Sequence, residues 1–173
     1  MNLKNFLPFD NFKLLTKLTP SEVNQRIESI TELKKGLNFS FSTNRTKPYE
    51  GNLIDRSFEI SRIISYRNSF LPVIKGHVST YLGKTEVAIK MRPVVFVLIF
   101  MSLWLGIVGL ICLGIITAAI LHFKQLLEQG FSPGALVPFG IFAFGYALLT
   151  IAYKVESQKS KAFLTQLLEA EEV

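Results

Sequence analysis

The side chains best suited to binding a charged ligand gather between residues 56 and 68. A guanidinium group binds carboxylates and phosphates through paired hydrogen bonds, and three arginines lie within this stretch. Arg62 alternates in register with Phe58, Ile60 and Ile64, which predicts that it points inward and binds an anion or a carboxylate. The alternative is an exposed arginine at the end of a strand. The predicted ligand or partner site comprises Arg56, Arg62, Tyr66, Arg67 and Asn68.

Three other combinations of reactive residues lack the context that their chemistry requires. Gly83–Thr85 has the ending of a phosphate-binding loop, but position 78 holds valine where that motif has its first glycine, and the flanks alternate like strands. His77 and His122 lie on opposite sides of a long apolar segment and cannot share a metal ion. Asp55 and Glu59 have no supporting acid, base or metal pattern. We therefore expect a non-enzymatic protein without a metal or a cofactor.

The elements that carry these residues are a short helix followed by a small sheet. Thr19–Glu22 reads as a capping box with proline at the first helical position, which predicts a helix that ends before Gly36. After that glycine the apolar period changes to two. We expect four or five sequential antiparallel strands, because every connection is short, with a hairpin turn at Gly83-Lys84 and the helix over one face. The predicted strands cover residues 37–41, 51–53, 58–64, 70–81 and 85–91.

Two apolar segments follow the sheet. Residues 93–121 contain no formally charged side chain, and as a helix they are ~43 Å long against a bilayer hydrocarbon core of ~30 Å. A second apolar segment covers residues 135–153. The sequence therefore predicts a transmembrane helical hairpin over residues 93–153, between a cytoplasmic α+β domain at residues 1–92 and a cytoplasmic helix at residues 154–173.

The distribution of charge predicts the orientation and the partners of the chain. Residues 1–92 hold 15 Lys and Arg against 8 Asp and Glu, whereas residues 93–173 hold 4 against 5. Basic residues flank both apolar segments on the side away from the connecting loop, so both termini are expected in the cytoplasm of a two-pass plasma (inner) membrane protein. The basic domain is expected to contact anionic lipids. Nucleic acid is not expected as a partner, because the basic residues are dispersed.

Small residues recur at helical spacing in both apolar segments, and such faces let helices approach closely in lipid. One interpretation is that the two helices pack on each other. The other is that a small face mediates self-association, into a pore or with another membrane protein. The predicted packing residues are Ser102, Gly106, Gly109 and Thr117 in the first segment, and Gly140, Ala143, Ala147 and Thr150 in the second.

The C-terminal segment is predicted to continue the second apolar helix, because neither glycine nor proline follows residue 153. Its apolar stripe must be buried, and the nearest surface is the sheet. That stripe comprises Phe163, Leu164, Leu167 and Leu168.

The run Phe58–Pro72 and the order of sheet, apolar hairpin and amphipathic helix resemble small uncharacterised bacterial membrane proteins. The order also resembles bacterial pleckstrin-homology-like proteins of the YcxB-like kind. That resemblance implies a partial antiparallel barrel capped by a helix and tied to membrane helices, without a catalytic signature. In this sequence the hairpin lies between the sheet and the final helix, which departs from the arrangement usual in those proteins.

Two functions are compatible with this sequence. The first is a membrane-anchored binding or scaffold protein whose cytoplasmic sheet binds a partner or ligand at the membrane surface. The alternative is an oligomeric pore-forming or membrane-disrupting effector that its cytoplasmic domain gates.

Overall fold

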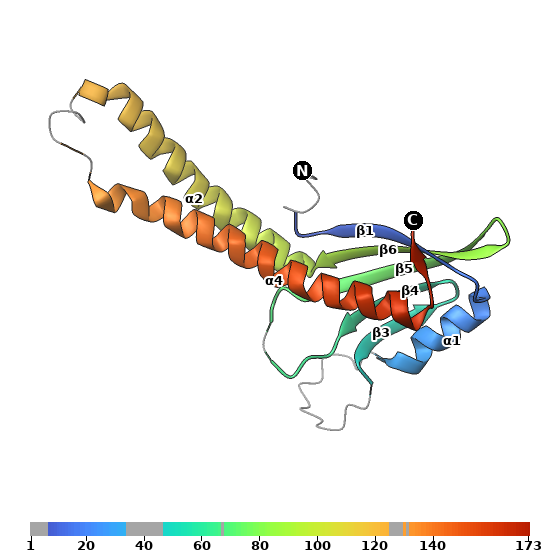
Figure 1. Ribbon diagram of the computed structural model, residues 1–173. Coiled ribbons are helices and arrows are strands. Elements are labelled where there is room, and N and C mark those ends of the chain that lie inside the picture. The colour runs from blue at the N-terminus through green and yellow to red at the C-terminus, as the bar shows by residue number, and fades with distance from the viewer. Residues whose placement is uncertain (1–6, 34–46, 67, 125–129, 131) are drawn as a thin grey trace. The chain divides into compact units, whose positions relative to one another are not determined.

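The chain has an α+β fold with a seven-stranded mixed sheet, two long apolar helices and one short helix within the described residues (Figure 1). The computed structural model describes residues 7–33, 47–66, 68–124, 130 and 132–173. The elements, in chain order, are β1 (Asp10–Thr16), α1 (Pro20–Ile30), β2 (Thr31–Leu33), β3 (Tyr49–Ile54), β4 (Ser57–Arg62), β5 (Pro72–Tyr81), β6 (Lys84–Pro93), α2 (Val95–Leu121), a 3₁₀ turn (Pro133–Leu136), α4 (Val137–Leu167) and β7 (Glu171–Glu172).

The chain divides into two compact units. The first, here called the sheet unit, comprises Met1–Val94 and Ala152–Val173, and the second, the helical unit, comprises Val95–Ile151. Helix α4 is continuous across the boundary between them, since its residues 137–151 belong to the helical unit and its residues 152–167 to the sheet unit.

Helix α1 begins at the predicted capping box. The Thr19 backbone N–H donates to Glu22 Oε2 at 2.7 Å, and the Glu22 backbone N–H donates to Thr19 Oγ1 at 3.3 Å. The hydrogen bond from the Thr19 backbone N–H, followed by the one from its hydroxyl, lowers the pKa of Glu22. Val23 and Ile27 on the opposite side of α1 are fully buried.

The strands are ordered β2-β3-β4-β5-β6-β1-β7. Neighbouring strands are antiparallel except β2 and β3, which are parallel. The sequence predicted only antiparallel pairs, but a parallel pair requires a long connection, and residues 34–48 provide one. The predicted strand 37–41 lies outside the described residues. Strands β1 and β7, which the sequence did not predict, extend the sheet beyond β6.

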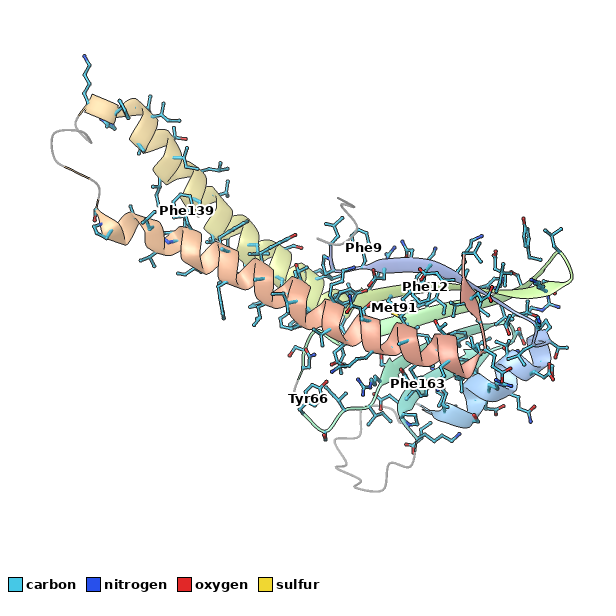
Figure 2. The ribbon with its side chains drawn as sticks, viewed as in Figure 1. Phe9, Phe12, Tyr66, Met91, Phe139 and Phe163 are labelled. Carbon is cyan, nitrogen blue, oxygen red and sulfur yellow. The ribbon has the colours of Figure 1, made fainter. Side chains whose placement is uncertain are left out.

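Strands β1, β3, β4, β5 and β6 bury alternate side chains on one face of the sheet. Met91 of β6 and Phe12 of β1 belong to the same buried cluster as Leu164 of α4 and Leu168, the residue after α4. Figure 1 shows the end of α4 lying along the sheet, and Figure 2 labels Phe12, Met91 and Phe163 where the two meet. Helices α1 and α4 therefore cover one face, which we call the core face. We call the opposite face of the sheet the open face.

The β5–β6 hairpin turns through a leucine in a left-handed conformation. Leu82 has φ +48°, its neighbour Gly83 has φ +77°, and the Leu82 side chain is 86% exposed. Asparagine tolerates this conformation better than leucine does. We expect Leu82→Asn to stabilise the sheet unit by about 1 kcal/mol, because the strain falls and no buried contact is lost. Thermal unfolding in detergent measures this, and an unchanged or lower midpoint would contradict it.

The apolar helices expose their side chains. Helix α2 and the segment Pro133–Leu167 are long and apolar enough to cross a membrane, and only 11% and 17% of their most apolar windows are buried. A helix in the core of a soluble domain would bury most of such a window. Length and composition are therefore compatible with membrane association.

Candidate functional site

Arg62 and Tyr66 from the predicted site meet a carboxylate of the chain itself. Arg62 Nη1 lies 2.9 Å from Glu156 Oε2, and the Tyr66 hydroxyl donates to Glu156 Oε1 at 2.6 Å. Lys159 Nζ donates to the same oxygen at 2.8 Å. Glu156 is 2% exposed, so these groups take the place of water around its charge.

The protonation of this cluster follows from its contacts. Burial raises the pKa of Glu156, but hydrogen bonds from Lys159 and Tyr66, together with the positive charges of Lys159 and Arg62, outweigh burial and hold the pKa below its ordinary value. The hydrogen bond to Glu156 raises the pKa of Tyr66 and that of Lys159. At neutral pH the carboxylate is therefore ionised, and it joins β4 and the segment after it to α4.

The remaining residues of the predicted site are not brought together with this cluster. The Arg56 side chain is exposed at the β3–β4 turn. Asn68 Oδ1 accepts from the Phe70 backbone N–H at 2.9 Å and so shapes a turn. Arg67 lies outside the described residues. Of the four predicted positions that are described, Arg62 and Tyr66 share a partner, Glu156, and no hydrogen bond or ion pair joins Arg56 or Asn68 to it.

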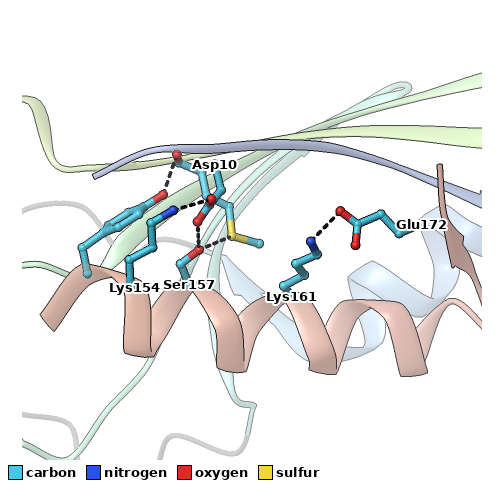
Figure 3. A network of polar contacts seen from close by, with 7 residues as sticks. Asp10, Lys154, Ser157, Lys161 and Glu172 are labelled. Carbon is cyan, nitrogen blue, oxygen red and sulfur yellow. Dashed lines mark hydrogen bonds and ion pairs between the residues drawn. The ribbon is translucent and has the colours of Figure 1, made fainter. Parts of the chain in front are cut away.

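A second polar network joins β1 and β6 to α4 (Figure 3). Lys154 Nζ donates to Asp10 Oδ1 at 2.7 Å, and the Ser157 hydroxyl donates to the other oxygen of Asp10. The Tyr153 hydroxyl donates to the Met91 carbonyl oxygen at 2.7 Å. Every group in this network has a partner within the sheet unit, so its role is to fix α4 on the core face.

The open face carries polar side chains in cross-strand pairs. Lys75 Nζ lies 2.8 Å from Glu59 Oε2, and the Ser57 hydroxyl lies 3.0 Å from His77 Nδ1. A cavity of about 710 Å³ is hollowed over β3 to β6. Its lining includes Ser57, Glu59, Lys75, His77 and Lys90. This volume falls in the range of small-molecule sites, so the open face has room for a small ligand beside these polar side chains.

The open-face residues could have been found from the sequence. The alternation in residues 85–91 predicts one polar face for that strand, and lysine 90 lies on it. The register observed across the Leu82-Gly83 turn places Lys75 opposite Lys90, whereas the predicted turn at Gly83-Lys84 places His77 there, and both side chains lie on the same polar face. Sequence reasoning favoured the arginines instead, because a guanidinium is the more specific anion ligand.

The small residues of the helical unit differ in their surroundings. Ser102, Gly106 and Thr117 of α2 are exposed, as are Gly140 and Ala143 of α4. Gly109 and Ala147 are half-buried, and Thr150 is buried. A Cβ atom on Gly109 would lie 3.4 Å from Phe142, and one on Gly145 would lie 2.2 Å from Trp104. The closest approach thus involves Gly145, which the sequence did not single out.

Comparison with known proteins gives no further guide, since no protein-family model, curated protein or solved structure matches the chain.

Proposed function

We propose that this chain is a non-enzymatic, membrane-anchored binding module whose cytoplasmic open face holds a partner or ligand. Helix α2 and residues 133–151 form its membrane anchor, and both termini are cytoplasmic. At 1.5 Å per residue, residues 133–151 span ~28 Å, close to the ~30 Å hydrocarbon core.

The observation that supports this proposal is that helices cover one face of the sheet and leave the other face uncovered. Helix α1 and residues 152–167 of α4 cover the core face. The earlier residues of α4 are apolar and largely exposed. The open face has no helix over it within the described residues, and it contains the cavity of about 710 Å³. Anchoring and binding thus use opposite faces, which lets a bound partner stay next to the membrane without displacing the anchor.

Cysteine labelling tests the anchoring. In a Cys112→Ser background, Asn52→Cys places a thiol on the open face and Ser132→Cys places one in the loop between the apolar helices. Both positions are exposed. In spheroplasts, a membrane-impermeant maleimide should label the Ser132→Cys variant at once and the Asn52→Cys variant only after lysis. Labelling of the Asn52→Cys variant before lysis would contradict a cytoplasmic sheet.

The second candidate function is an oligomeric pore, and the exposed small residues favour it. A Cβ atom on Gly106 or Gly140 would meet no other atom within 4 Å. Both positions are therefore free to pack against another copy. Light scattering in mild detergent distinguishes the two functions. A defined oligomer of three or more chains that Gly106→Leu dissociates supports the pore, whereas a monomer or dimer supports the anchored module.

A further inference from the structure

Two neighbouring cations on the open face, at the end of β6 that leads into α2, have no carboxylate partner among the described residues. Lys90 and Arg92 of β6 point to this face, and neither forms an ion pair with any described residue. The neighbouring cations of the face are paired, Lys75 with Glu59 and Lys13 with Glu86. Lys84 at the start of β6 is also unpaired among the described residues, so the end of β6 that leads into α2 is distinguished by two such cations two residues apart.

The strand register places like charges opposite each other. Lys75 of β5 lies directly opposite Lys90, and Asn11 of β1 lies opposite Lys90 on its other side. Like charges at directly opposite positions destabilise a sheet. Glu59 offsets this repulsion for Lys75, but no described side chain does so for Lys90. An anion bound beside Lys90 would remove the repulsion.

The same end of the sheet carries exposed apolar side chains. Phe9, labelled in Figure 2, precedes β1 and is 39% exposed, and Leu7 is 38% exposed. Because Asp10 pairs with Met91, Phe9 lies at the end of the sheet where Arg92 lies. Cations beside an exposed aromatic ring are typical of surfaces that lie at the membrane interface.

The chain itself limits how far these cations are from the apolar helix. Val95 is the third residue after Arg92, so their Cα atoms are at most about 11 Å apart. Helix α2 has 27 residues and is ~40 Å long, which matches a bilayer including its head-group layers. With α2 in the membrane, the Arg92 side chain reaches the head groups, and Lys90 lies two residues further along β6.

From these observations we infer that Lys90 and Arg92, with Lys75 and Phe9 beside them, form a binding surface for the phosphate groups of anionic lipids in the bilayer that holds the chain. This inference rests on the proposed membrane anchoring. It adds a partner of defined chemistry, and it assigns the membrane-proximal part of the open face to lipid.

Lipid selectivity of the full chain tests the inference. The protein in neutral detergent is mixed with equal amounts of phosphatidylglycerol and phosphatidylcholine, and native mass spectrometry measures the ratio of the two lipids retained. The double variant Lys90→Gln, Arg92→Gln should retain roughly 25-fold less phosphatidylglycerol at low ionic strength, since each cation near an anionic surface contributes about fivefold. Added salt should reduce the difference.

The matched control removes two cations from the other end of the sheet. Lys17 and Lys84 are exposed, they form no ion pair with a described residue, and they flank the register pair Thr16 and Thr85. The variant Lys17→Gln, Lys84→Gln should change retention less than about twofold, because Lys84 lies ~20 Å from Lys90 along β6. Equal losses in both double variants, or no loss in either, would overturn the inference.

Two further measurements separate binding from folding and lipid from soluble anion. Lys90→Thr should melt at the same or a higher temperature, because it removes the repulsion from Lys75 and favours a strand, yet it should retain about fivefold less phosphatidylglycerol. Excess inorganic phosphate should reduce the retained lipid no more than sodium chloride of the same ionic strength does. A larger loss in phosphate than in sodium chloride would assign the site to a soluble anion and overturn the lipid assignment. Labelling at positions 52 and 132 tests the anchoring separately.

Discussion

Glu156→Gln should lower the free energy of unfolding of the sheet unit by about 2–4 kcal/mol. Glu156 is 2% exposed and receives contacts from Arg62, Tyr66 and Lys159. Glutamine preserves the volume but removes the charge, so two cations lose their shared counter-ion. Urea unfolding in detergent, followed by circular dichroism, measures the change.

The matched control for this prediction is Glu59→Gln. Glu59 also pairs with a lysine, but the side chains of Glu59 and Lys75 are 51% and 66% exposed. Pairs exposed to this degree contribute at most about 1 kcal/mol. Equal losses in Glu156→Gln and Glu59→Gln would contradict the role of Glu156 as a buried counter-ion.

Acid should reduce the difference in free energy of unfolding between the wild type and Glu156→Gln. The pKa of Glu156 in the folded chain lies below the ordinary value of 4.5. A carboxyl group with a lowered pKa stabilises the fold above its unfolded pKa, and this stability is lost as the pH falls through its folded pKa. The difference between the two proteins should therefore be constant near neutral pH and shrink below about pH 4.5. A difference that grows in acid would contradict the assigned direction.

Leu164→Ala should destabilise the sheet unit by about 3–4 kcal/mol. Leu164 is fully buried and belongs to the same cluster as Ile74, Val87 and Met91 of the sheet, so its truncation leaves a cavity between α4 and the core face. The exposed Gln166 on the same helix supplies the control, because Gln166→Ala removes no buried contact. Urea unfolding in detergent compares the two variants, and equal midpoints would show that α4 does not complete the core.

The sequence predicted the local elements well wherever one interaction dominates. The uncharged run 93–121 corresponds to α2 at Val95–Leu121, and the capping box corresponds to the start of α1. The hairpin turn was expected at Gly83-Lys84 and lies one residue earlier, at Leu82-Gly83. Tyr81 pairs with Lys84, and both residues between them have a positive φ. These features depend on neighbours within a few residues, so periodicity and turn chemistry suffice to find them.

Long-range pairing was less accessible to sequence reasoning. Strand β1 has an alternating pattern in which Phe12 and Leu14 are buried, but seven residues near an N-terminus do not identify their partner, β6. The inward orientation of Arg62 followed from its register, whereas its contact, Glu156, lies 94 residues away in a helix. No local pattern distinguishes a ligand carboxylate from one supplied by the chain, so the arginines were interpreted as a ligand site.

The most direct test of an anchored binding module is hydrogen exchange of the full chain in lipid nanodiscs, because anchoring requires α4 to pass unbroken from the bilayer into the sheet unit. We expect amides of residues 97–119 and 139–150 to exchange very slowly. Amides of residues 152–166 should exchange as slowly as those of β6, without a rapidly exchanging break near residue 152. Rapid exchange at residues 150–156, or throughout α2, would show that the sheet is not held to the membrane through one continuous helix.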